Sequence, residues 1–133
     1  MNKNDLRVVK TKNGIHQALL HILQNKPLMQ IKVTELCKAA NINRGTFYFH
    51  YEEVGDVFAE LYEEIMIDLK ASYNEPYKQT NHLNVETLDP NTIRIFHHIK
   101  RYESFYKIVL SENVSMTYYY MLFDAVRSIF ING

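Results

Sequence analysis

Apolar residues recur through most of this chain at the spacing of one face of an α-helix. The pattern predicts a first helix from about Thr11 to Gln24, and Pro27 prevents it from continuing. Residues 1–10 have no clear period, so we expect a polar arm there that either lies along a phosphate backbone or is simply disordered. Three apolar residues after the proline are expected to pack beneath the next segment: Leu28, Met29 and Ile31.

The segment from Lys32 to Tyr51 predicts two short helices joined by a tight turn. Val33, Leu36, Cys37 and Ala40 mark one face of the first helix. Asn41 and Asn43 favour a turn, and Asn43 can cap a second helix that begins at Arg44. In this second helix Phe47 is expected to point into the core with Ile42.

The remaining chain also predicts helices. A long one runs from about Val54 to Ser72, with a water-exposed side that carries Glu60, Glu63, Glu64 and Asp68. Residues 73–88 read as a loop, and Asp89 with Pro90 begins another helix. That helix breaks near residues 101–103, and Ser111 to Ser115 precedes a last helix rich in aromatic residues.

The second short helix offers chemistry that suits a nucleic acid. Arginine can bond a guanine edge, threonine can contact a thymine methyl, and tyrosine or histidine can bond phosphate oxygens. Glycine inside a helix costs about 1 kcal/mol relative to alanine, which indicates that something approaches closely there. The alternative is an ordinary solvated helix. The residues concerned are Arg44, Gly45, Thr46, Tyr48 and His50.

The stretch ALLHILQNKPLMQIKVTELCKAANINRGTFYFHY resembles the DNA-binding domain of the tetracycline-repressor (TetR) family of bacterial transcription regulators. The resemblance covers about residues 8–70 and implies an all-α fold with an N-terminal three-helix, helix-turn-helix head. A longer helix would join this head to a small helical regulatory body over residues 71–133. The DNA-binding positions that the motif implies are Lys32, Thr34, Asn43, Arg44, Gly45, Thr46, Tyr48, His50 and Tyr51.

The resemblance further implies a dimeric regulator, usually a repressor, that binds a palindromic double-stranded operator. Two heads related by a two-fold axis would meet half-sites about 34 Å or a multiple apart. A small-molecule or protein effector would release the operator by favouring a body shape in which the heads are wrongly spaced. No cofactor or metal is expected, and the expected location is the cytoplasm.

The chain departs from the family pattern at three places. Lys32 stands where a serine or threonine usually caps the helix, although Glu35 keeps the acidic half of a capping box. Glu52 and Glu53 precede a position where relatives commonly carry a lysine that contacts DNA. Family bodies usually continue well beyond Gly133, so we expect either a truncated chain or a dimer built from the remaining helices. These departures leave a second interpretation open, a protein-interaction adaptor with weakened DNA binding.

Charge separates the two parts of the chain, although its total is zero. Residues 1–51 contain eight Lys and Arg against two acids, a net charge of +6, so residues 52–133 carry −6. A basic part beside an acidic part indicates a polyanion partner for the first. The single Cys37 cannot form an internal disulfide. No apolar run reaches a membrane span, and no phosphate loop or nucleophile motif indicates an enzyme.

The aromatic residues of the C-terminal half can enclose an effector pocket or fill a solid core. We expect Ile93, Phe96, His97 and Lys100 on one face of their helix, and at least one residue of Tyr118–Tyr120 exposed. Adjacent histidines point in different directions, so His97 and His98 do not favour a metal site. Core packing is favoured over effector contact for any single tyrosine. The candidate pocket residues are Phe96, Tyr102, Tyr106 and Tyr119.

Overall fold

The computed structural model describes residues 5–77 and 90–132, and every regular element in these ranges is a helix. The all-α prediction is therefore confirmed for this part of the chain. The elements are α1 (Leu6–Leu23), the short 3-10 helix η1 (Leu28–Gln30), α2 (Val33–Ala40), α3 (Arg44–His50), α4 (Val54–Tyr77), α5 (Pro90–Arg101), α6 (Glu103–Val109) and α7 (Met116–Asn132).

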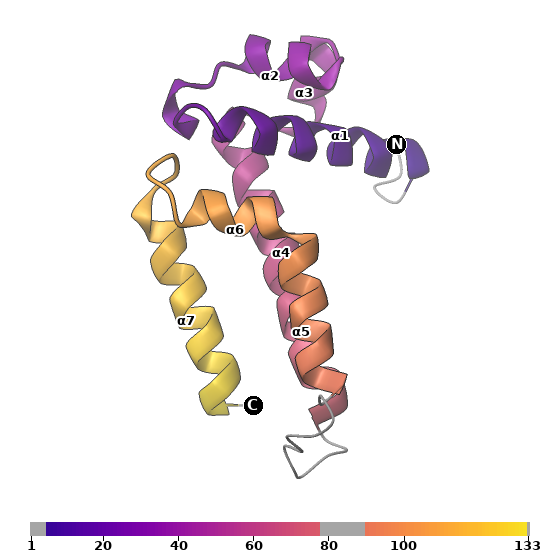
Figure 1. The fold of residues 1–133 in the computed structure, drawn as a ribbon. Coiled ribbons are helices and arrows are strands. Elements are labelled where there is room, and N and C mark those ends of the chain that lie inside the picture. Colours follow the sequence, from indigo (N-terminus) through magenta and orange to yellow (C-terminus); the bar gives the residue numbers. More distant parts are fainter. Residues whose placement is uncertain (1–4, 78–89, 133) are drawn as a thin grey trace.

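The long helix α4 organises the molecule. α1 lies across one end of α4 (Figure 1). α2 and α3 lie on one side of α1, and α6 lies on the other side of α1. α5 and α7 run along the rest of α4. The predicted break between α5 and α6 is present at Tyr102. This arrangement places α3 at the end of the molecule that is farthest from the C-terminus of α7.

Two helices extend beyond their predicted limits. α1 begins at Leu6, because the carboxylate of Asp5 accepts a hydrogen bond of 2.8 Å from the backbone N–H of Arg7 and caps the helix. The prediction of a flexible arm is therefore wrong for residues 5–10, and residues 1–4 lie outside the described part. α4 continues to Tyr77, so the predicted loop is wrong for 73–77, and 78–89 are not described.

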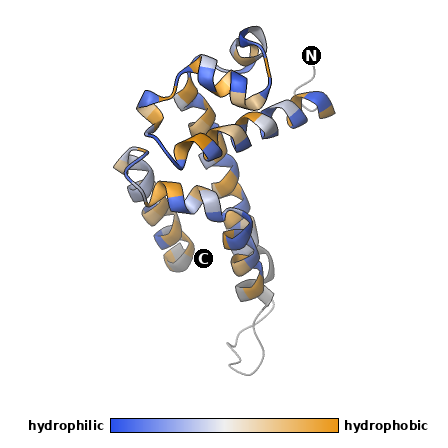
Figure 2. Ribbon diagram, turned by 45° about the horizontal axis from the view of Figure 1, so that its top comes forward, coloured by the Kyte–Doolittle hydropathy of each residue, from blue (hydrophilic) through white to orange (hydrophobic). Residues whose placement is uncertain are grey.

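A continuous apolar core joins the N-terminal and C-terminal helices. Apolar and polar residues alternate along the helices, as the colouring in Figure 2 shows, and many of the apolar ones pack into this core. Ile31 is buried and Leu28 packs against the core, but the prediction for Met29 is wrong, because its side chain is 98% exposed. Cys37 is buried, and burial raises the pKa of its thiol. The largest fully buried side chains come from five helices: Ile15, Leu19, Leu23, Leu36, Phe47, Val57, Phe58, Ile65, Phe105 and Val109.

The predicted water-exposed side of α4 is wrong at Glu60, because this carboxylate holds three internal partners. Its Oε1 accepts a hydrogen bond of 2.6 Å from the Tyr51 hydroxyl and lies 2.9 Å from Nε2 of His16. Its Oε2 accepts a bond of 2.9 Å from Lys12. Burial alone would raise the pKa of Glu60, but the hydrogen bonds from Lys12, Tyr51 and His16 outweigh it and lower the pKa from 4.5. Glu60 thus joins α1, the end of α3 and α4 through one ionised group.

A second, part-buried polar chain joins α4, α5 and α6. Nδ1 of His98 lies 2.6 Å from the Asp68 carboxylate, and Nε2 lies 2.6 Å from the Tyr106 hydroxyl. His98 is buried, whereas Ile93, Phe96, His97 and Lys100, which were predicted to share one face, are all exposed, so that face of α5 points outward. Asp68 keeps 36% of its side chain exposed and has His98 as an internal partner.

Within the described ranges, no helix is long and apolar enough to cross a membrane.

Replacement of Glu60 by glutamine tests the network around this residue. Glutamine keeps an acceptor for Tyr51 but removes the charge beside Lys12, so we expect the free energy of unfolding at pH 7 to fall by about 1–2 kcal/mol. Because the pKa of Glu60 is lowered on folding, its stabilisation is present above pH 4.5 and is lost as the pH falls through the folded value. Urea titrations from pH 7 to pH 3 should show the variant and the parent converging, and a constant difference would contradict this role.

Candidate nucleic-acid interface

The turn between α2 and α3 is built by two asparagines. Asn41 ends α2 with φ 57° and ψ 47°, a left-handed conformation that asparagine tolerates better than most residues. Its backbone N–H bonds back to the carbonyls of Cys37 and Lys38. The side chain of Asn43 then accepts a hydrogen bond of 2.8 Å from the backbone N–H of Thr46, which confirms the predicted cap of α3.

One side chain anchors α3 to the rest of the molecule. Phe47 is fully buried and is the single buried residue of this helix. Its ring meets Tyr48 edge-on at 5.4 Å and Tyr51 at 5.5 Å between centroids. Ile42 packs partly buried against the same core, so the predicted inward pair is confirmed. The other residues of α3 are exposed or half-buried.

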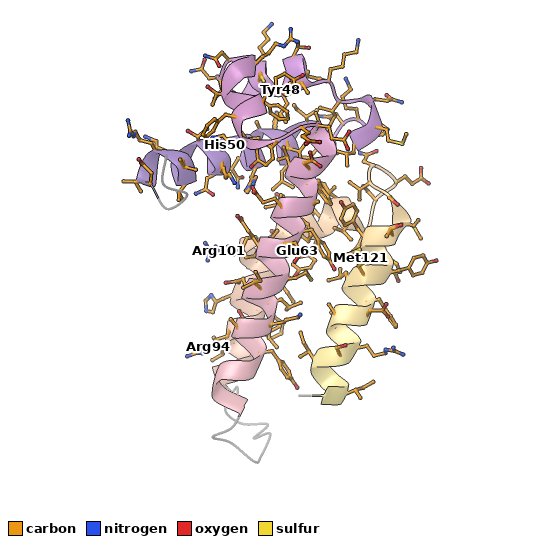
Figure 3. The ribbon with its side chains drawn as sticks, turned by 180° about the vertical axis from the view of Figure 1, so that it is seen from behind. Tyr48, His50, Glu63, Arg94, Arg101 and Met121 are labelled. Carbon is orange, nitrogen blue, oxygen red and sulfur yellow. The ribbon has the colours of Figure 1, made fainter. Side chains whose placement is uncertain are left out.

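The outward faces carry most of the predicted contact residues. Arg44 and Gly45 are exposed, Thr46 and His50 are half-buried, and Tyr48 is 50% exposed. Figure 3 shows the side chains of Tyr48 and His50 at the end of the molecule formed by α2 and α3. Lys32 and Thr34 are exposed at the start of α2. A methyl group at Gly45 would meet only the Asn43 side chain, at 3.4 Å, so internal packing does not require glycine here.

Tyr51 is a correction to the predicted set. Its side chain is only 6% exposed, and its hydroxyl donates to Glu60 at 2.6 Å. Burial, followed by the bond to Glu60 and the negative charge there, raises the pKa of this hydroxyl. Tyr51 therefore closes the end of α3 onto α4 and has no free group to offer to a phosphate.

His50 is placed to act as a neutral group. Burial lowers its pKa below 6.5, and the nearby charge of Lys12 lowers it further, while Glu60 acts weakly in the opposite direction. At neutral pH an imidazole of this kind can donate or accept one hydrogen bond but brings little positive charge.

A hollow of about 430 Å³ lies between the first turns of α1 and the exposed side of α3. The sequence predicted the side of the hollow that α3 forms. It did not predict the side that α1 forms, because residues 6–10 were expected to be an arm and are helical. It also missed Phe49, which is 64% exposed on α3. The basic character of the N-terminal segment was the signal available for Arg7. The residues that line the hollow are Arg7, Val8, Thr11, Asn43, Gly45, Thr46, Phe49 and His50.

Several basic residues near α3 are already paired with acids. Lys12 binds Glu60, and Lys26 lies 3.1 Å from Glu35, which leaves Glu35 out of the predicted capping box. Lys32 begins α2 without a side-chain cap. Beyond α3, the backbone N–H groups of residues 52 and 53 bond to the carboxylate of Asp56, at 3.2 and 3.1 Å.

The candidate effector pocket is located differently from its prediction. A cavity of about 310 Å³ lies between α4, α5, α6 and α7, and Tyr106 is the one predicted residue on its wall. Phe96 is 60% exposed and Tyr119 is 36% exposed, while the ring of Tyr102 rests 5.0 Å from that of His98. The wall is almost wholly apolar and consists of Leu69, Tyr73, Ile95, Ile99, Tyr106, Leu122, Val126 and Ile129.

One group of side chains between α1 and α4 has the composition of a metal site. His16, Glu60 and Glu64 place ligand atoms within 4.8 Å of one another. Both oxygens of Glu60 already accept bonds from Tyr51 and Lys12, so this carboxylate is satisfied by the protein itself. The group is better explained as part of the contact between α1 and α4.

No protein-family model matches the chain, and no solved structure matches it. What α3 can contact must therefore be inferred from its side chains and their surroundings.

Proposed function

We propose that this chain is a DNA-binding transcriptional regulator, a repressor of the TetR type, in which α2 and α3 act as a helix-turn-helix. The observation that carries the proposal is that α3 buries one side chain, Phe47, and turns polar, hydrogen-bonding side chains outward. A short exposed helix at one end of a molecule can enter the major groove of a duplex, and the residues of its first turns then reach the base edges.

The side chains of α3 divide into two kinds of contact. Arg44 can bond a guanine edge with two donors, and the methyl group of Thr46 can contact a thymine. The exposed hydroxyl of Tyr48 and the neutral imidazole of His50 can bond phosphate oxygens or base acceptors. At Gly45 the bare backbone permits close approach of the duplex.

Phosphate contacts come from the start of α2 and from α1. The ammonium groups of Lys12 and Lys26 are held by acids, so the positive charge available to DNA is carried by other residues. Lys32 and Lys38 are exposed on α2. Arg7 is exposed beside the hollow that α3 borders, and its pair with Asp5, 3.2 Å away at the surface, is weak enough to be exchanged for a phosphate. Glu52 and Glu53 weaken the electrostatic attraction just beyond α3.

Regulation in this proposal uses the cavity among the C-terminal helices. Its apolar wall suits a small apolar effector, which would stabilise one arrangement of α4 relative to α7. Because α4 also carries Glu60, a change in its position alters the support of α3. Two copies on a palindromic operator would then lose their spacing.

Replacement of Arg44 by alanine tests direct DNA contact. Duplexes that bind the chain are first selected from a random pool, and affinities are then measured between about 50 and 200 mM salt. We expect Arg44→Ala to weaken binding by about 1–3 kcal/mol and to relax preference at one position of the site. Lys70→Ala, an exposed basic residue on the distal half of α4, serves as the control and should bind as the parent does.

Absence of sequence preference and of a salt slope in the parent chain would contradict the DNA proposal. That result would favour the alternative function, a protein-interaction adaptor with weakened DNA binding, which Glu52 and Glu53 support. We would then expect the chain to co-purify with another protein.

Two tyrosines form a matched pair of hydroxyl deletions. Tyr48→Phe removes an exposed hydroxyl, so we expect weaker DNA binding with an unchanged free energy of unfolding. Tyr51→Phe removes the internal bond to Glu60, so we expect stability to fall by about 1 kcal/mol while DNA affinity is kept. Urea unfolding and DNA titration of both variants give the two readouts. The reverse pattern would show that the contact set has been assigned to the wrong tyrosine.

Filling the cavity tests the effector site. The fluorescence of N-phenyl-1-naphthylamine, a neutral apolar probe, should increase saturably with the parent chain. In Val126→Trp the indole occupies the cavity, so we expect probe binding to fall about ten-fold while helix content by circular dichroism is kept. The matched control is Phe123→Trp on the exposed side of α7, which should bind the probe normally. Equal binding by all three chains would exclude this cavity.

A further inference from the structure

Helix α7 is covered on one side only. Tyr118, Leu122 and Ile129 turn toward the core, where α7 contacts α4 and α6. Figure 1 shows α7 at the edge of the molecule, with none of the described helices on its outer side. A helix that is apolar on both sides is normally buried on both. The outer side carries large apolar residues that are 58–71% exposed: Met116, Tyr120, Phe123 and Ile131.

The outer side of α7 also carries two opposite charges in a defined order. Tyr120, Asp124, Arg127 and Ile131 follow one another at helical spacings of four, three and four residues and so form a single stripe. Both charged residues are exposed, and neither makes an ion pair with another residue of the described ranges. Along the helix the stripe therefore reads apolar, negative, positive, apolar.

This order is complementary to itself when one copy is reversed. In an antiparallel pair, Tyr120 of each copy faces Ile131 of the other, and Asp124 of each copy faces Arg127 of the other. The two ion pairs lie at the centre, and apolar contacts close both ends over a stripe about 16 Å long. A parallel pair would instead place like charges opposite each other, which is unfavourable. We propose that α7 is a self-association surface, on which a second copy of this chain packs antiparallel about a two-fold axis.

The pairing would supply the two-fold axis that operator binding requires, but it stands on α7 alone and is tested without DNA. A single pair of helices buries less area than the roughly 1,200 Å² of a stable interface. We therefore expect a reversible dimer with a dissociation constant in the micromolar range.

Charge exchange on the stripe tests the proposal by sedimentation velocity of the 133-residue chain over a range of concentrations. Asp124→Arg places two arginines opposite each other in each half of the dimer, and Arg127→Asp places two aspartates there. Each variant alone should self-associate about ten-fold more weakly than the parent. An equimolar mixture of the two should dimerise like the parent, because every arginine then meets an aspartate. The chain with both exchanges should also dimerise.

Glu112→Arg makes the same charge change at an exposed position outside α7 and should leave association unchanged. A parent chain that stays monomeric at all concentrations overturns the proposal. It is equally overturned if the single variants associate as well as the parent, as a parallel pair requires, or if their mixture fails to recover. A dimer that binds no DNA supports the α7 surface and contradicts the proposed function. DNA binding by a chain that stays monomeric contradicts the α7 surface and supports DNA binding.

Discussion

The Glu60 carboxylate is the interaction on which the placement of α3 depends. It lies on the central helix α4 and holds Lys12 and His16 of α1 together with the hydroxyl of Tyr51, the residue that ends α3. This carboxylate is part-buried, and its three partners offset the desolvation that would otherwise favour its neutral form. Phe47 fills the core beneath α3 and fixes the middle of this short helix, and Glu60 fixes its end through Tyr51.

The parts of this fold that depend on local sequence could be predicted. The asparagine cap of α3, the inward Phe47, the buried Cys37 and the apolar face of α4 all follow from spacing and residue type, because a helix buries the same face wherever it packs. The exposed arginine and tyrosine of α3 could be identified as contact candidates for the same reason.

Features that depend on partners distant in the sequence could not be predicted. Glu60 and Asp68 look like members of a solvated acidic face until the helices that bring Lys12 and His98 to them are in place. His98 is buried because two groups distant in sequence satisfy both its ring nitrogens, and no periodicity reveals that. The helix at residues 6–10 was missed because its cap, Asp5, stands in a segment with few apolar residues. The cavity wall combines residues from four helices, so reasoning on single helices named Phe96, which is exposed, and missed Ile95 and Ile99 of the same helix.

Asn41 is the one described residue other than glycine with a positive φ, and it sets the direction in which the chain leaves α2. The angle at which α3 departs is consequently a property of backbone conformation and of the phenylalanine beneath it, not of the outward side chains. Substitutions on the exposed face can therefore change the side chains that α3 presents to solvent while the direction of the helix stays the same. The surface chemistry of α3 and the geometry of its support are thus set by different residues.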